Sequence, residues 1–142
     1  MKNKATPVIS VVLLTVQFLC AFFLCGCSIT EDNGMKLRDL EFTLVSEDCL
    51  PEELKSLIEE RKSEEFKFTY TDNESLYICI GYGEQTTGGY SITVNELYLT
   101  DNAIYVDTNL LGPSAKEKET PAVSYPYIVI KTELLDKSVV FE

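Results

Sequence analysis

The middle of the chain alternates apolar and polar residues with a period of two. Residues 66–71 read Phe-Lys-Phe-Thr-Tyr-Thr, and in residues 76–82 the apolar side chains of Leu76, Ile78, Ile80 and Tyr82 alternate with Tyr77 and Cys79. Because successive side chains of a β-strand point to opposite faces, each run predicts a strand. The residues between them, Thr71-Asp72-Asn73-Glu74, are short and polar, bond readily to their own backbone and tolerate positive φ. The pattern predicts a β-hairpin.

Similar runs predict five further strands. They cover residues 37–45, 90–99, 103–110, 125–132 and 139–141. The trio Thr100-Asp101-Asn102 repeats the first turn and predicts a second hairpin, and a change of parity within it predicts a β-bulge near Asn95-Glu96. Pro126 indicates that the strand around it starts there or lies on an edge.

Residues 51–62 predict one amphipathic helix. Apolar residues fall at positions i, i+3 and i+4, acids follow a proline at its start, and two basic residues lie at its end. We therefore expect an α+β fold that is mainly antiparallel, a compact β-sheet domain of about seven short strands with one helix. The residues that define the helix are Pro51, Glu52, Glu53, Leu54, Leu57, Ile58, Arg61 and Lys62.

Residues 1–26 have the layout of a signal peptide. A short basic start precedes a largely apolar stretch from Val8 to Leu24. That stretch ends in Leu24-Cys25-Gly26-Cys27, which resembles the lipobox of bacterial lipoproteins. The resemblance implies cleavage before Cys27 and a lipid on its thiol, which would hold the protein on the extracytoplasmic face of the cell membrane. The alternatives are plain secretion and an uncleaved anchor helix, since an apolar stretch of about 17 residues is barely long enough to span a bilayer.

The chain after the signal peptide divides into a tether and a domain. Residues 27–36 comprise the lipidated Cys27 and a polar segment that we expect to be flexible. Residues 37–142 form the β-rich domain, which keeps two further cysteines, Cys49 and Cys79. Outside the cytoplasm these two thiols could form a disulfide. The alternative is that Cys79 is a small buried apolar residue of a strand and that Cys49 is free in a turn.

Composition excludes several classes of function. The chain contains no His and no Trp, so it cannot build a Ser-His-Asp triad, a Cys-His pair or a His-ligated metal site by itself. Its 12 basic and 23 acidic residues disfavour nucleic acid, which binds mainly through Lys and Arg. We expect no catalytic residues, no metal and no cofactor.

Residues 81–90 concentrate four of the seven glycines. Such a cluster indicates unusual backbone angles or close approach of another group. It is either a glycine-rich connection without a ligand or a protruding loop that contacts another protein. For the second reading, tyrosines nearby are the best contact residues, because they offer a large rigid area with a polar tip; the alternative is ordinary strand tyrosines. The candidate partner-binding residues are Tyr82, Glu84, Gln85, Thr86, Thr87, Gly88, Gly89, Tyr90, Tyr125 and Tyr127.

Two elements in this region carry a family resemblance. They are Thr87-Gly88-Gly89-Tyr90-Ser91 and Ser124-Tyr125-Pro126-Tyr127, which flank a hydrophobic hairpin and a Gly112-Pro113 loop. Together they resemble the C-terminal domain of the protease complex subunit PrcB family over roughly residues 65–135. The resemblance implies a non-catalytic lipoprotein subunit that binds and stabilises a secreted or surface protease.

Two other functions remain open. Threonine–threonine–glycine loops such as Thr86-Thr87-Gly88 are similar to those of chagasin-like inhibitors of cysteine proteases, although Glu84-Gln85 replace the Asn-Pro of that pattern. The last alternative is an envelope structural domain without a specific partner.

Overall fold

The computed structural model describes residues 34–115 and 121–142. The predicted signal peptide, Cys27 and most of the predicted tether lie outside these residues. The described part of the chain contains eight strands, one α-helix and one 3₁₀ turn. The elements are β1 (Lys36–Asp39), β2 (Phe42–Leu44), η2 (Glu47–Cys49), α2 (Glu52–Arg61), β3 (Glu65–Thr71), β4 (Ser75–Tyr82), β5 (Ser91–Thr100), β6 (Ala103–Leu111), β7 (Tyr127–Glu133) and β8 (Ser138–Phe141).

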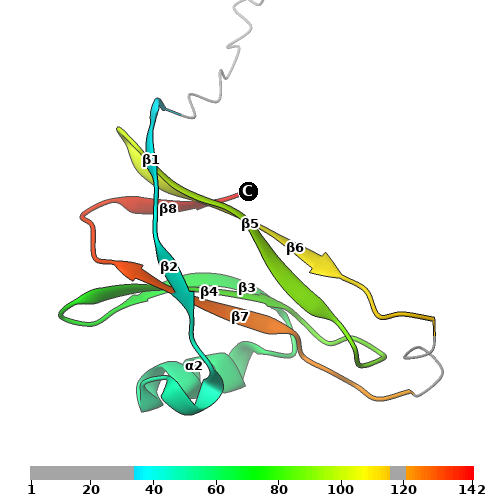
Figure 1. The fold of residues 1–142 in the computed structure, drawn as a ribbon. Helices are drawn as coiled ribbons and strands as arrows, with labels where there is room; N and C mark the ends of the chain where they lie inside the picture. Colours follow the sequence, from blue (N-terminus) through cyan, green and yellow to red (C-terminus); the bar gives the residue numbers. More distant parts are fainter. Residues whose placement is uncertain (1–33, 116–120) are drawn as a thin grey trace, which may run out of the picture. The chain divides into compact units, whose positions relative to one another are not determined.

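The strands form two four-stranded sheets. Sheet A has the order β1-β5-β6-β8, and sheet B has the order β2-β7-β4-β3 (Figure 1). Every pairing is antiparallel except that of β6 with β8. The predicted α+β class, a compact β-sheet domain with mainly antiparallel strands and one helix, is therefore confirmed. The pattern of alternation alone does not say which strands pair.

The two sheets face each other across an apolar core. Alternate residues of the central strands point into it, which explains the period of two in the sequence. Ile78, Ile104 and Ile130 are completely buried there. The other buried members are Leu40, Leu76, Ile80, Leu97, Val106 and Ile128.

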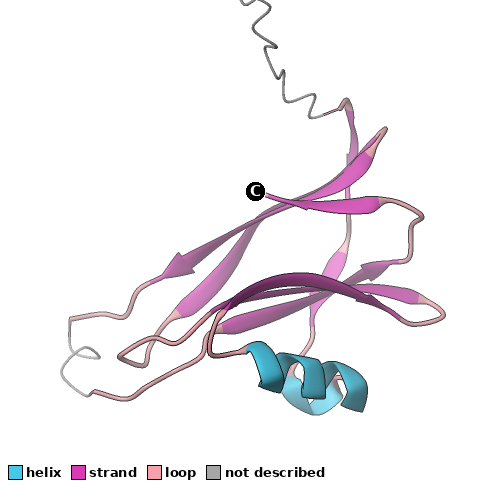
Figure 2. Ribbon diagram, turned by 180° about the vertical axis from the view of Figure 1, so that it is seen from behind, coloured by secondary structure: helices cyan, strands magenta, loops and turns pink. Residues whose placement is uncertain are grey.

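Helix α2 covers the outer face of sheet B (Figure 2). Leu54 and Ile58, one turn apart, are buried against Tyr77, Cys79 and Val129 of the sheet. Strand β4 is thus buried on both faces. The predicted helix is confirmed within one residue at each end, and Pro51 lies at its N-cap.

The predicted first strand, 37–45, is split between the two sheets. Strand β1 pairs with β5 in sheet A, and β2 pairs with β7 in sheet B. The break falls at Leu40, which is buried between the sheets and donates its backbone N–H to Leu97 O at 3.0 Å. Burial of this one side chain redirects the chain, so the segment bridges two layers.

Both predicted hairpins are present, and the bulge lies at Asn95, where the register of β5 shifts between Val94 and Glu96. The turns do not use positive φ, because every described residue with positive φ is a glycine. They use side-chain acceptors instead. Asp72 Oδ1 accepts the backbone N–H groups of Glu74 and Ser75 at 2.8 and 2.6 Å.

Strand β7 begins at Tyr127, directly after Pro126, and lies inside sheet B between β2 and β4. A proline directly before the first position leaves the ladder bonds of the strand intact. The prediction that Pro126 marks the start of this strand is therefore confirmed, and the edge alternative is wrong. The last strand, β8, is the edge of sheet A.

The possible disulfide is absent. Both Cys49 and Cys79 are free thiols. Cys79 is buried under helix α2, where desolvation raises its pKa to about 12, and Cys49 is exposed at the end of η2. The alternative of a buried apolar Cys79 and a free Cys49 therefore describes the structure.

Candidate functional site

The glycine loop, defined here as residues 83–90, connects β4 of sheet B with β5 of sheet A. Gly81 and Tyr82, the first residues of the glycine cluster, still belong to β4. In Figure 1 the glycine loop lies at the same end of the sandwich as the connection between β6 and β7. The opposite end carries the first described residues, where Met35 bonds to Asp101 in the β5–β6 turn.

At three of the four glycine positions the structure explains why a residue without a side chain is needed. Gly81 packs so closely on the Phe66 ring that a Cβ would lie 2.2 Å from it. Gly83 has φ +68° and packs on the backbone of residues 63–65, and Gly89 has φ +80°. Such angles strain any residue with a Cβ. Gly88 differs, because a Cβ there would meet nothing within 4 Å.

Ser124 ties the glycine loop to the segment that precedes β7. Its backbone forms an isolated antiparallel bridge with Gln85, with N–H to O distances of 2.8 and 3.0 Å in the two directions. Its hydroxyl donates to Thr87 O at 2.7 Å. The Gln85 side chain turns back and donates to Tyr82 O at 2.9 Å. These bonds satisfy three backbone groups of the loop and tie the loop to the segment before β7.

A second contact joins the loop to helix α2. Tyr125 donates its hydroxyl to Glu84 Oε2 at 3.1 Å, and this bond is the main cause of a raised Tyr125 pKa. The Lys62 ammonium lies 5.5 Å from the centre of the Tyr125 ring. It also pairs with Glu59 at 2.6 Å. Lys62, Tyr125 and Glu84 therefore form a continuous polar rim from the end of the helix to the loop.

The four candidate tyrosines have different environments. Tyr82 packs on the inter-sheet core, and its hydroxyl shares a 2.8 Å hydrogen bond with Thr108. Tyr127 packs on the core under the helix, where burial and the nearby Glu47 carboxylate raise its pKa to about 12. Both side chains hold the fold together. Tyr125 and Tyr90 are half-buried at the loop.

The candidate contact residues of the loop are partly accessible to solvent. Glu84, Thr86 and Gly89 are exposed, and Gln85, Thr87 and Gly88 are half-buried. The accessible polar groups of the loop include hydroxyls, one carboxylate and backbone amides. Within residues 34–115 and 121–142, no group of three acids or thiols could hold a metal ion. Across the same residues, no helix has the length and apolar character needed to span a membrane.

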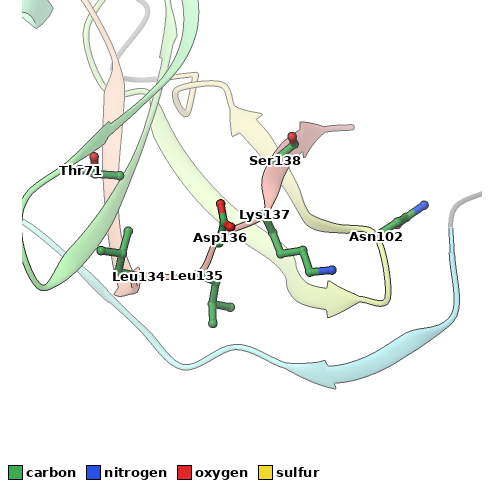
Figure 3. A pocket seen from close by; sticks show the side chains of 7 residues that line it. All are labelled: Thr71, Asn102, Leu134, Leu135, Asp136, Lys137 and Ser138. Carbon is green, nitrogen blue, oxygen red and sulfur yellow. The ribbon is translucent and has the colours of Figure 1, made fainter.

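A hollow of about 650 Å³ lies at the opposite end of the sandwich, around the β7–β8 connection (Figure 3). The side chains of Asn102, Asp136 and Lys137 point in different directions around it. Lys137 donates to Asp101 O at 2.6 Å and so secures the neighbouring turn. Ligand sites need a few convergent polar groups, and this hollow does not have that arrangement.

Sequence reasoning missed two residues of the site. Ser124 bridges to Gln85 across 39 positions of the chain, and Lys62 reaches Tyr125 from the helix. No local sequence pattern marks Ser124 or Lys62, because their contacts arise from the pairing of segments that are distant in the chain. Ser124 stood in the sequence only as the first residue of the Ser-Tyr-Pro-Tyr element.

Comparison with known proteins gives one match. The family described as PrcB C-terminal matches residues 76–133. No curated protein and no solved structure matches the chain significantly. The matched stretch runs from β4 to β7 and supplies the two central strands of each sheet together with the glycine loop. The resemblance inferred from the Thr-Gly-Gly-Tyr and Tyr-Pro-Tyr elements is thus confirmed, because the PrcB C-terminal family matches the part of the chain that carries both elements.

Proposed function

We propose that this protein is a non-catalytic lipoprotein subunit that binds and stabilises a secreted or surface protease through the glycine loop. The family of residues 76–133 supports a protease-associated role. The observation that carries the proposal is the set of hydrogen bonds that tie the loop to Ser124. Ser124 holds Gln85 and Thr87 in place, while Glu84, Thr86 and Gly89 stay exposed. A surface that is ordered before binding loses less entropy when a partner docks.

The position of the loop agrees with membrane attachment through Cys27. The first described residues lie at the end of the sandwich opposite the glycine loop (Figure 1). An anchor that holds the N-terminal end therefore leaves the loop end free to meet a partner. Replacement of Cys27 by Ser is expected to release the protein from the membrane fraction, and a Cys27→Ser protein that stays there would contradict lipid attachment.

Site-specific crosslinking in intact cells tests the binding surface. A photoreactive amino acid replaces Thr87 in the loop, and in a control strain it replaces Asn73, an exposed residue of the β3–β4 turn. We expect a protease to be crosslinked from position 87 and not from position 73. Equal products from both positions, or none from position 87, would contradict the proposal.

A variant with Gly88→Tyr sharpens this test. Because a Cβ at position 88 would meet nothing within 4 Å, the fold should be retained while the contact surface is blocked. Crosslinking from position 87 should then be lost, although the melting temperature is unchanged.

A protease assay distinguishes the proposed stabilising subunit from the inhibitor alternative. The purified protein is added to papain-like and subtilisin-like proteases, and a stabilising subunit does not abolish their activity.

A further inference from the structure

Half of one edge of strand β5 is unpaired. Strand β6 pairs along one side of β5, from Ser91 to Leu99. On the other side β1 pairs only with residues 98–100, and Leu40 then bonds to Leu97 O. No strand in the described part of the chain pairs with residues 91–96 on that side. This stretch begins directly after the glycine loop.

The backbone groups of Ile92 and Val94 point toward the open edge. Glu142 N–H donates to Val106 O, so Val106 directs its backbone toward β8. Alternation along β6 gives Thr108 and Leu110 the same direction. Their partners across the antiparallel pair are Val94 and Ile92, which must then direct their N–H and C=O groups away from β6. Four backbone groups are thus available to a further strand.

The other edges of the sandwich are short or protected. Strands β2 and β8 have three and four residues. The β3 edge carries Lys67, which lies 5.8 Å from the Phe141 ring and donates to Glu142 O. Charged residues of this kind prevent strand addition at an edge. Residues 91–96, Ser-Ile-Thr-Val-Asn-Glu, contain neither a basic residue nor a proline.

Apolar side chains are uncovered on the same open side of the sandwich. Leu44 of β2 pairs with Ile130, whose side chain lies in the inter-sheet core, so Leu44 points to the same inner face. It is nevertheless 53% exposed, and Phe42 is 41% exposed. These side chains are exposed because the chain crosses to sheet B at Leu40. It leaves sheet A after only the four residues of β1, so no strand of sheet A covers them. A strand added beside β5 would extend the cover that β1 begins.

Charges on the outer face of sheet A favour a basic segment. Glu96 lies opposite Asp107, and Asp39 lies opposite Tyr98, whose ring stacks on Tyr105 at 5.3 Å. Lys36 pairs with Asp39 at 2.8 Å. One cation therefore stands against three carboxylates. Outward side chains at the Asn95 end of an added strand therefore lie next to net negative charge.

We propose that an extended segment of the protein partner adds to sheet A as a strand beside Ser91–Val94. Its inward side chains are apolar and its outward side chains are basic. The bulge at Asn95 limits the new pairing to the residues before it. The proposal rests on the proposed function for the existence of a partner, and it gives that partner a second contact that is continuous with the glycine loop.

Model peptides test this edge without knowledge of the partner. The probe is a fluorescent peptide of about six residues with alternating Val and Lys, long enough to span an ordinary strand. We expect its anisotropy to rise on binding and the exchange of the Ile92 and Val94 amides to slow at least about tenfold. The same peptide with Glu in place of Lys should bind about tenfold more weakly.

Two N-methylated peptides provide matched controls. Methylation of the amides that face β5 must abolish binding, whereas methylation of the opposite amides leaves it unchanged, because those amides face solvent. Absence of binding by the Val-Lys peptide, or protection at β3 instead of β5, would overturn the proposal. Protection of Ile92 and Val94 that rises with protein concentration without peptide would also overturn it, since the occupant would be a second copy of the chain.

The two proposals can fail separately. If position 87 crosslinks a protease while the peptide leaves Ile92 and Val94 unprotected, the loop function stands and strand addition fails. If the peptide binds at β5 while position 87 crosslinks nothing, the glycine loop is not the binding surface.

Discussion

Gln85 and Ser124 form a two-way backbone bridge between the glycine loop and the segment before β7. The Ser124 hydroxyl adds a third bond, to Thr87 O at 2.7 Å. The position of the loop backbone therefore depends on Ser124, a residue that is distant in the sequence.

Replacement of Ser124 by Ala should loosen the loop and leave the sheets intact. One hydrogen bond of this kind contributes about 0.5–1.5 kcal/mol. We expect faster hydrogen exchange in residues 85–89 and little change in melting temperature. Ser91→Ala, at an exposed position beside the loop, is the matched control. Unchanged exchange in Ser124→Ala would show that the backbone bridge alone fixes the loop.

Gly81 and Gly88 should respond oppositely to the same substitution. Gly81→Ala places a methyl group against the Phe66 ring, and overpacking of this kind costs about 1–3 kcal/mol. Gly88→Ala meets no neighbour, so its effect should stay within about 0.5 kcal/mol. Urea unfolding measures both. Equal stabilities of the two variants would contradict the packing described for β4 and β3.

Tyr127 should make the protein sensitive to alkaline pH. Burial beside Glu47 raises its pKa from 10.0 to about 12. A raised pKa means that the stabilisation is complete below the unfolded pKa and is lost as the pH rises from about 10 through the folded value. The free energy of unfolding should therefore fall less steeply with pH over this range in Tyr127→Phe than in the original protein. If the free energy of unfolding fell equally with pH in the two proteins, Tyr127 would not contribute to the alkaline sensitivity.

The two cysteines of the domain should differ in reactivity. Cys49 is exposed, whereas Cys79 is buried with a pKa raised to about 12. Since the thiolate is the reactive form, iodoacetamide should label Cys49 in the native protein and Cys79 only after denaturation. Peptide mapping by mass spectrometry identifies the labelled site. Recovery of a peptide in which Cys49 and Cys79 are linked would instead revive the disulfide.

Local patterns predicted most of the elements. Helix α2 followed from the spacing of Leu54 and Ile58, and the bulge at Asn95 followed from the change of parity in β5. These features are encoded by neighbours in the chain. The division into two sheets is not, because Leu40 continues the alternation of its segment while its burial moves the chain from one sheet to the other.

The candidate site was predicted only in part. Glycine density located the loop, since Gly83 and Gly89 do require positive φ. The roles of the tyrosines depend on tertiary packing. Tyr82 and Tyr125 look alike in sequence, yet the first bonds to Thr108 of the opposite sheet and the second bonds to Glu84 of the loop. No local pattern distinguishes these two environments.

The crossing of the chain at Leu40 also has a mechanical consequence. Strands β1 and β2 follow each other in series from the N-terminal end (Figure 1). Their ladder bonds to β5 and β7 lie perpendicular to the strands. A pull on Lys36 along β1 therefore loads the three paired positions of each strand in shear, and the bonds of one strand must break together instead of one after another.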